Sequence, residues 1–124
     1  MQQDQAIIVF ESLSSPIRLE VFRLLVRVGA DGMVAGEIAA AVGQLPAHLS
    51  FHLKALSRAG LLEGTQEGRY QRYRANLALM AELIAYLTEE CCAGHPELCI
   101  ELAGTASPQT PTRAATRAAT SGRR

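Results

Sequence analysis

The sequence predicts a mainly α-helical domain that carries one β-hairpin. Apolar residues recur at helical spacing along most of the chain, and a glycine break separates two short helices within residues 37–59. Two short extended runs follow, joined by a turn that contains glycine. Two helices separated by a tight turn and followed by a hairpin describe a winged helix-turn-helix, a unit whose second helix can enter the DNA major groove.

The N-terminal region predicts two helices. Four apolar residues suggest a short first helix: Ile7, Ile8, Phe10 and Leu13. Ser15 is a good N-cap, and Pro16 suits the first position of a second helix. The apolar residues of this second helix recur at helical spacing: Ile17, Val21, Leu24, Leu25 and Val28. Two glycines within residues 29–32 end it.

The middle region predicts the helix-turn-helix and the hairpin. A third helix is expected over residues 37–42 and a fourth over about 46–59, with Gly43 between them. The apolar stripe of the fourth helix is Leu49, Leu53 and Leu56. The hairpin strands are expected over residues 61–65 and 70–74, joined by a glycine turn.

The C-terminal region predicts one more helix and a tail. The helix is expected over residues 77–92, with an apolar stripe of Met80, Leu83, Ile84, Leu87 and Cys91. Residues 103–124 contain four arginines and no large apolar side chain, so they cannot offset the entropy of ordering. We therefore expect a folded domain over residues 1–102 and a disordered basic tail, which is either a solvated extension or a weak aid to DNA binding.

Charge is balanced over the whole chain but not along it. The formal net charge is zero, which argues against a simple polyanion binder. Residues 44–76 nevertheless contain five basic residues against two acidic ones, while residues 1–43 and 77–102 have an acidic excess. A phosphate backbone responds to such local charge. The candidate DNA-contacting residues are Ala47, His48, Ser50, Phe51 and Lys54 on the fourth helix, with Arg69 and Arg72 in the hairpin.

Phe51 is the least usual of these candidates. It lies roughly 200° around the helix from Leu49, so it should be exposed. An aromatic ring there can contact thymine methyl groups, while His48 and Ser50 can hydrogen-bond to base edges or phosphates. The alternative is that Phe51 packs under the hairpin or at a dimer contact. His52 borders the leucine stripe and needs no more than a hydrogen-bond partner.

All three cysteines of the chain, Cys91, Cys92 and Cys99, lie within nine residues. Thiolates select soft metals, although free cysteines also pack as small apolar residues. The Cα atoms of neighbouring residues are about 3.8 Å apart, whereas unstrained disulfides join Cα atoms roughly 4.4–6.8 Å apart. A disulfide between Cys91 and Cys92 is therefore disfavoured. Gly94 and Pro96, which break the helix between the thiols, favour an exposed cluster over buried packing.

Three stretches of the sequence resemble the ArsR family of metal-sensing repressors: LSSPIRLEVFRLL at 13–25, LSFHLKALSRAGLL at 49–62 and EGRYQRYR at 67–74. The most specific part is His52-Leu-Lys-x-Leu-x-x-Ala-Gly-Leu61. The resemblance implies a winged-helix homodimer that binds double-stranded operator DNA and leaves it when a metal binds. It also implies that the first and last helices meet at the dimer interface, with Ile7, Ile8, Met80, Leu83, Ile84 and Leu87 as candidates.

The chain departs from two common patterns of this family. Many arsenic sensors carry a Cys-Val-Cys pair on the third helix, whereas residues 33–38 contain no thiol. The family's zinc sites use Asp and His ligands along the last helix, which here has no histidine before Cys92. The chain therefore resembles the subgroup with thiolates at the end of the last helix, a ligand set that suits trivalent arsenic or antimony.

The expected function is an arsenite- or antimonite-responsive repressor that needs no cofactor to fold. A thiol redox switch, and a zinc or cadmium site that adds His95 to the cysteines, are the alternatives. A thiol-dependent enzyme is disfavoured, because Glu89, Glu90 and Glu97 make a poor setting for a reactive thiolate. The N-terminus does not resemble a secretory signal and no apolar run approaches the roughly 20 residues of a membrane span, so we expect a cytoplasmic protein.

Overall fold

The structure is a computed structural model that describes residues 1–95. It divides into two compact units, Met1–Tyr86 and a second that begins at Leu87. The predicted basic tail at 103–124 lies outside the described residues. Within residues 1–95, no helix is long and apolar enough to cross a membrane.

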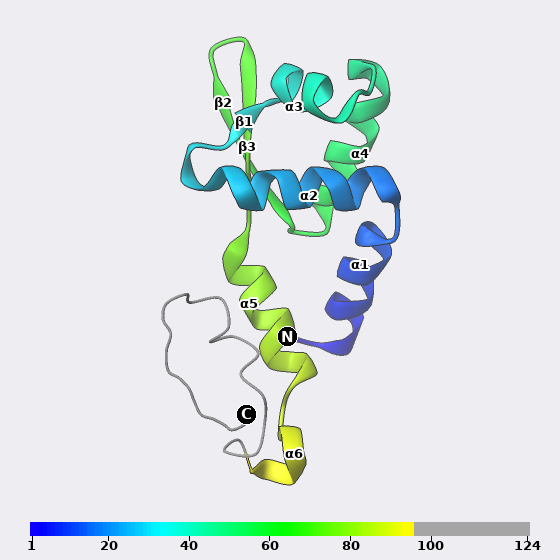
Figure 1. Cartoon of the computed structure of the whole chain (residues 1–124), viewed down its shortest axis with the longest axis vertical. Helices are drawn as coiled ribbons and strands as arrows, with labels where there is room; N and C mark the ends of the chain where they lie inside the picture. The colour runs from blue at the N-terminus through cyan, green and yellow to red at the C-terminus, as the bar shows by residue number, and fades with distance from the viewer. Residues whose placement is uncertain (96–124) are drawn as a thin grey trace, which may run out of the picture. The chain divides into compact units, whose positions relative to one another are not determined.

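The first unit is mainly helical, with a small sheet (Figure 1). The helices are α1 (Gln3–Leu13), α2 (Pro16–Val28), α3 (Ala35–Val42), α4 (Pro46–Arg58) and α5 (Leu77–Leu87), with a 3-10 turn, η1, at Gly29–Asp31. The strands are β1 (Met33–Val34), β2 (Leu62–Glu67) and β3 (Tyr70–Ala75). They form one antiparallel sheet in the order β1-β3-β2. The predicted winged helix-turn-helix with one hairpin is confirmed, and β1 adds a strand that the pattern did not indicate.

Local side-chain chemistry fixes where two of the helices begin. Ser15 Oγ accepts a hydrogen bond from the Arg18 backbone N–H at 3.4 Å, and Pro16 occupies the first turn of α2, as predicted. Asn76 caps α5 in the same way, because its Oδ1 accepts from the Leu79 N–H at 3.1 Å. The Asn76 amide nitrogen also donates to the Gly60 carbonyl at 2.8 Å, which ties the start of α5 to the end of α4.

The core is formed by all five of these helices and the base of the hairpin. Its fully buried side chains include Leu25, Ile38, Leu49, Leu53, Leu56 and Leu61. From α1 the buried residues are Ala6 and Val9, and Leu13 packs against the core while half-buried, whereas Ile7, Ile8 and Phe10 are exposed. The leucine stripe predicted for α4 is confirmed, and burial of each such side chain is worth roughly 1.5–3 kcal/mol.

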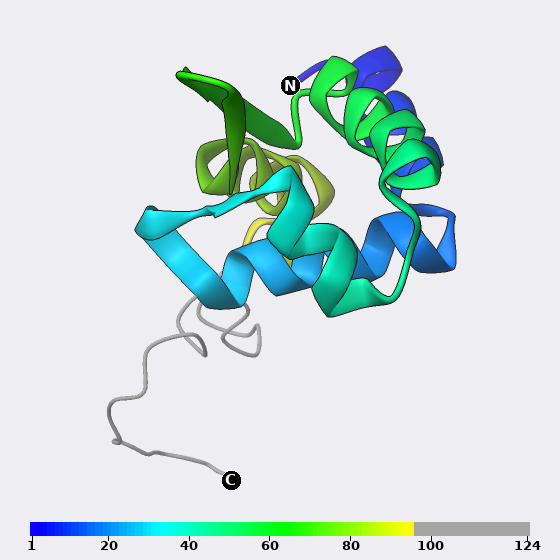
Figure 2. The ribbon, with the colours of Figure 1, turned by 90° about the horizontal axis from the view of Figure 1, so that it is seen from above.

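The hairpin, which we call the wing, turns within two residues. Glu67 pairs with Tyr70, and Gly68 and Arg69 form the loop between them. Gly68 has a φ of +61°, a conformation that glycine adopts without a Cβ penalty. In Figure 1, α3 lies between the wing and α4, and the view from above in Figure 2 shows the wing on the left, α4 on the right and α3 beside α2. Helix α3 contacts α4 as well as the strands β1 and β3.

The predicted last helix over 77–92 is wrong at its C-terminal end. Helix α5 stops at Leu87, and a separate four-residue segment, α6 (Cys91–Gly94), follows. Glu89 and Glu90 place negative charge at the negative end of the helix dipole, and α5 has no basic residue in its last turn. Glu90 has a φ of +52°, which a continuing right-handed helix cannot accommodate. Cys91 therefore does not belong to the apolar stripe of α5.

Candidate functional site

Helix α4 presents a reading face because its opposite face is held in the core. Gly43 ends α3 with a φ of +69°, and Pro46 opens α4, so the turn between the two helices is only three residues long. Leu49, Leu53 and Leu56 are at most 2% exposed. The candidates predicted on the other face are all exposed: Ala47, His48, Ser50, Phe51 and Lys54.

Phe51 is exposed over 67% of its surface, so it does not pack under the wing within the single chain. Its ring meets His52 edge-to-face, with centroids 5.6 Å apart and planes at 71°. Single exposed apolar side chains are common on protein surfaces, so exposure alone assigns no partner to this ring. Contact with thymine methyls and contact with a second protein chain both stay predictions.

His52 has the hydrogen-bond partner expected for it. Its Nδ1 lies 3.2 Å from Arg18 Nη1, and Arg18 Nε donates to the Ser12 carbonyl at 2.7 Å. Burial, followed by the nearby charges of Arg18 and His48, lowers the pKa of His52 below its ordinary value. The lowered pKa favours the neutral form of this imidazole on α4.

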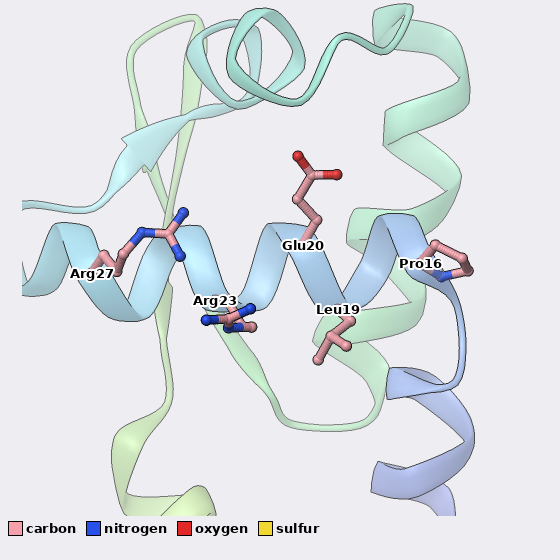
Figure 3. A pocket seen from close by; sticks show the side chains of 5 residues that line it. All are labelled: Pro16, Leu19, Glu20, Arg23 and Arg27. Atoms are coloured by element: carbon pink, nitrogen blue, oxygen red, sulfur yellow. The ribbon is translucent and has the colours of Figure 1, made fainter. Parts of the chain in front are cut away.

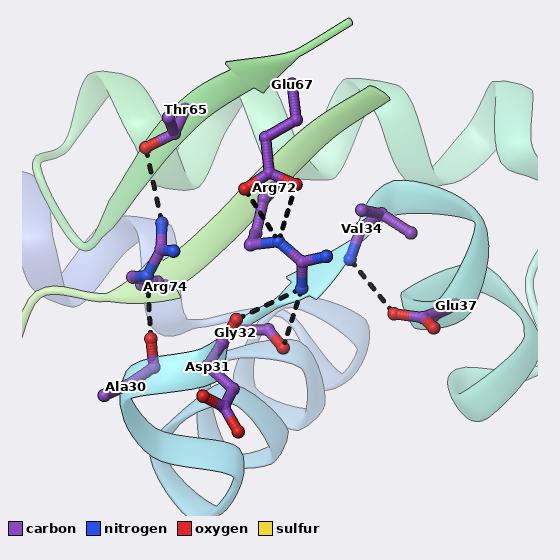
Figure 4. A network of polar contacts seen from close by, with 9 residues as sticks. All are labelled: Ala30, Asp31, Gly32, Val34, Glu37, Thr65, Glu67, Arg72 and Arg74. Atoms are coloured by element: carbon purple, nitrogen blue, oxygen red, sulfur yellow. Dashed lines mark hydrogen bonds and ion pairs between the residues drawn. The ribbon is translucent and has the colours of Figure 1, made fainter. Parts of the chain in front are cut away.

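The three arginines of the wing have different surroundings. Arg69 sits at the exposed tip, next to the turn glycine, where a guanidinium can reach a phosphate. Arg72 instead pairs with Glu67 at 3.0 Å and donates to the Asp31 carbonyl at 3.1 Å (Figure 4). Arg74 donates to the Ala30 carbonyl at 2.8 Å and to Thr65 Oγ1 at 3.3 Å. Arg72 stays a prediction as a DNA contact, but its guanidinium already has acceptors within the protein.

Arg72 and Arg74 fasten the wing to the turn that follows α2. Their acceptors at residues 30–32 are backbone carbonyls of η1 and the residue after it. Gly32, with a φ of +63°, allows the close approach, since a Cβ there would collide with the Tyr73 carbonyl. The sequence pattern showed neither contact, because each pairs residues about forty positions apart. The two arginines thus set the direction of the wing relative to α2.

The thiol segment, residues 91–95, contains two of the three predicted metal ligands. Cys91 Sγ and Cys92 Sγ lie 3.7 Å apart, with Cys91 half-buried and Cys92 exposed. Cys92 and Ala93 both adopt positive φ values of 58°. Cys99, the third predicted ligand, lies outside the described residues. Among residues 1–95, no group of three or more His, Cys, Asp or Glu side chains is gathered tightly enough to hold an ion.

Two helices expose apolar residues that the core does not use. On α1, Ile7, Ile8 and Phe10 are each about half exposed. On α5, Ile84 and Leu87 are exposed, whereas Met80 is half-buried. Leu83 is only 4% exposed and packs in the core, so it has little surface left for a partner. The other candidates for a dimer interface remain accessible.

A pocket of about 380 Å³ lies along the outer face of α2 (Figure 3). Its lining consists of Pro16, Leu19, Glu20, Arg23 and Arg27. All five side chains come from one helix, so the pocket lacks the convergent groups from several elements that small-molecule sites use.

These features define a DNA-binding protein of the winged helix-turn-helix class. The profile of a helix-turn-helix domain family matches residues 13–65. No curated protein matches the chain. Among solved structures, a possible transcriptional regulatory protein from Mycobacterium bovis shares 34% identity, with 68% of this chain and 87% of that chain covered and a TM-score of 0.56.

Two further structures identify the family. A homodimeric winged helix-turn-helix DNA-binding domain from Mycobacterium bovis, a possible ArsR-family regulator, is 31% identical over 74% of this chain and 85% of that one, with a TM-score of 0.54. An ArsR-like transcriptional regulator from a Rhodococcus species is 27% identical over 77% and 87% of the two chains, with a TM-score of 0.64. The chain belongs to the ArsR-like winged-helix family of transcriptional regulators.

Proposed function

We propose that the protein is an arsenite- or antimonite-responsive repressor. In this proposal it binds operator DNA as a homodimer and leaves the DNA when the trivalent metalloid binds its cysteine thiolates. The observation that carries the metalloid part is the pair of adjacent thiols with sulfur atoms 3.7 Å apart. The DNA-binding part of the proposal is inferred from membership of the family, and the response to metalloid is inferred from the thiols.

The reading face supports operator binding in the major groove. An α-helix fits that groove, and the exposed residues of α4 include a hydroxyl, an imidazole, an ammonium and an aromatic ring. Arg69 extends from the wing tip, where it can contact the phosphate backbone or the minor groove. Of the basic residues in the middle of the chain, Lys54 and Arg58 lie on α4 itself and Arg69 lies at the tip of the wing.

The homodimer rests on the exposed apolar residues of α1 and α5. Apolar side chains such as Ile8 and Ile84 lose contact with water when a second copy covers them. The related domain from Mycobacterium bovis is itself homodimeric. Two reading helices in one dimer would match half-sites separated by roughly 34 Å, one turn of DNA.

The thiol pair fits a shared thiophilic ion. Two sulfurs bound at about 2.3 Å with tetrahedral angles would lie about 3.8 Å apart, close to the separation of Cys91 and Cys92. Once bound, the ion cross-links the thiolates that hold it. Cys99 would add a third sulfur to the site, which suits trivalent arsenic and antimony. Participation of His95 in place of Cys99 would favour zinc or cadmium, so the third ligand decides between the two proposals.

The switch requires thermodynamic linkage between the thiols and the reading face. The metalloid must bind the low-affinity conformation of the dimer better than the DNA-bound one, by as much as operator affinity falls. Cys91 lies four residues after the end of α5, so closing the site would pull on a helix that carries exposed dimer residues. A change in the dimer would then move the two reading helices out of register with their half-sites.

The test is a release titration on a fluorescent duplex selected from a random pool by the reduced protein. Arsenite, antimonite, zinc, cadmium and peroxide are added in parallel. We expect arsenite and antimonite to release the wild-type protein at the lowest concentrations, and Cys91→Ser or Cys92→Ser to bind the duplex normally but resist release.

His95→Gln is the matched control for this experiment. It should respond to arsenite as the wild type does, because the proposed site uses sulfur only. Release by zinc alone, with loss of that release in His95→Gln, would replace the metalloid by zinc. Release by peroxide alone would favour the redox switch.

A further inference from the structure

The guanidinium of Arg18 joins three helices. Arg18 lies in the first turn of α2, and its Nε donates to the carbonyl of Ser12 in the last turn of α1 at 2.7 Å. Its Nη1 lies 3.2 Å from Nδ1 of His52, which is in the middle of the recognition helix α4. One half-buried side chain thus holds the corner between α1 and α2 against the helix that faces DNA.

The contact with His52 has only one possible direction. Arginine stays protonated and its guanidinium has donors but no acceptor. Nδ1 of His52 must therefore accept, so its proton resides on Nε2 and the ring is neutral. Protonation of Nδ1 would place an N–H against the Arg18 N–H groups and end the hydrogen bond.

The link connects two surfaces that the proposed function needs. Ser12 belongs to the helix that exposes Ile7, Ile8 and Phe10, the candidate dimer face. His52 is adjacent to Phe51 and contacts its ring on the reading face. We propose that Arg18 is a positioning residue for operator binding, which sets the orientation of α4 relative to α1 through its paired hydrogen bonds to Ser12 and His52. This inference rests on the proposed function, since it assumes that α1 lies in a dimer.

The link makes operator binding sensitive to acid. The charged and titratable groups that face His52 are Arg18 from α2 and His48 from α4 itself, with the neutral Ser12 carbonyl contributed by α1. Burial and both neighbours lower the pKa of His52, so the folded protein binds fewer protons there than the unfolded chain. The link is fully present above the ordinary histidine value near 6.5 and is lost as the pH falls through the lowered value.

The experiment measures operator affinity between about pH 8 and pH 5.5 at constant ionic strength, by anisotropy of the selected duplex. His48→Gln serves as the parent protein, because His48 on the reading face would gain charge in acid and strengthen phosphate attraction. We expect the parent to lose about tenfold in affinity over this range, the effect of one hydrogen bond to a charged group.

Two variants in that parent separate positioning from simple stability. Asn at position 52 offers an amide oxygen where Nδ1 stood and does not titrate, so His52→Asn should keep the affinity measured at high pH and show a flat profile. Arg18→Met should bind about tenfold more weakly at high pH, with a flat profile as well. Arg23→Met, on the same helix but in the outer pocket, should follow the parent.

The affinities of these variants test whether Arg18 positions α4 for operator binding. A His52→Asn variant that loses affinity in acid as the parent does, or a folded Arg18→Met dimer that binds as tightly as the parent, would overturn the inference. Thermal melts and sedimentation check folding and assembly, and if Arg18→Met fails to fold, the His52→Asn profile still decides. Arsenite release is recorded on the same samples. A pH effect without arsenite release would refute the metalloid response in the proposed function and leave operator binding and the Arg18 link standing.

Discussion

The recognition helix α4 and the thiol segment at residues 91–95 are positioned in opposite ways. Helix α4 is anchored by Leu49, Leu53 and Leu56, all nearly or fully buried, and it displays polar residues on its free face. The thiol segment has no buried residue, and its course is set by backbone turns with positive φ at Glu90 and Cys92. The reading face is therefore built into the fold of the chain, whereas the thiol segment depends on backbone turns and not on core packing.

The largest effect expected from this difference concerns stability. Leu53→Ala removes a core side chain of α4 and should lower the free energy of unfolding by about 2–5 kcal/mol. Cys91→Ser should leave the thermal midpoint unchanged, since it removes no buried packing. Differential scanning calorimetry of the two variants measures both effects. A Cys91→Ser midpoint that falls as far as that of Leu53→Ala would show that the thiol segment is part of the core.

The next largest effect concerns assembly. Ile8→Glu would bury a carboxylate at the proposed dimer interface, which is costly, and should yield monomers that lose about a hundredfold or more in operator affinity. Val26→Glu is the matched control, because Val26 is also an exposed apolar residue but lies on α2. Sedimentation velocity should show a monomer for the first variant and a dimer for the second. An intact Ile8→Glu dimer would remove α1 from the interface.

The smallest expected effect concerns the wing tip. Arg69→Ala should weaken binding to every duplex and lower the slope of log affinity against log salt by about one, the loss of one phosphate contact. Arg23→Ala removes an equal charge from the α2 pocket and should leave the slope unchanged. Filter binding at several salt concentrations gives both slopes. Equal slopes for Arg69→Ala and the wild type would show that the wing tip does not touch DNA.

The parts of the fold that depend on local sequence were predictable. The Ser15 cap, the leucine spacing of α4 and the Gly68 turn each involve residues within a few positions of one another, and the structure confirms them. The end of α5 at Leu87 was not predictable from spacing, because apolar periodicity continues to Cys91 while the backbone turns at Glu90.

The contacts that position the site were beyond the reach of sequence patterns. Strand β1 is defined by its pairing with β3, in which Met33 lies opposite Tyr73. The contact between Arg18 and His52 joins residues 34 positions apart in the sequence. Arg72 was predicted as a DNA contact because it is a basic residue in the hairpin. In the structure, its guanidinium pairs with Glu67 and donates to the Asp31 carbonyl. Residue type predicted the chemistry available at the site, but only the packing of distant segments shows which of those groups are already occupied.

We propose that thiol occupancy and operator binding are linked through one dimer. The most direct measurement is the arsenite dissociation constant of the reduced protein, determined once on free dimer and once on dimer saturated with the selected duplex. Reciprocity requires arsenite to bind the DNA complex more weakly, by the same factor by which arsenite weakens operator affinity. We predict that the two factors agree and that both vanish in Cys91→Ser. Equal arsenite affinity with and without DNA would show that the thiols and the operator site are not linked.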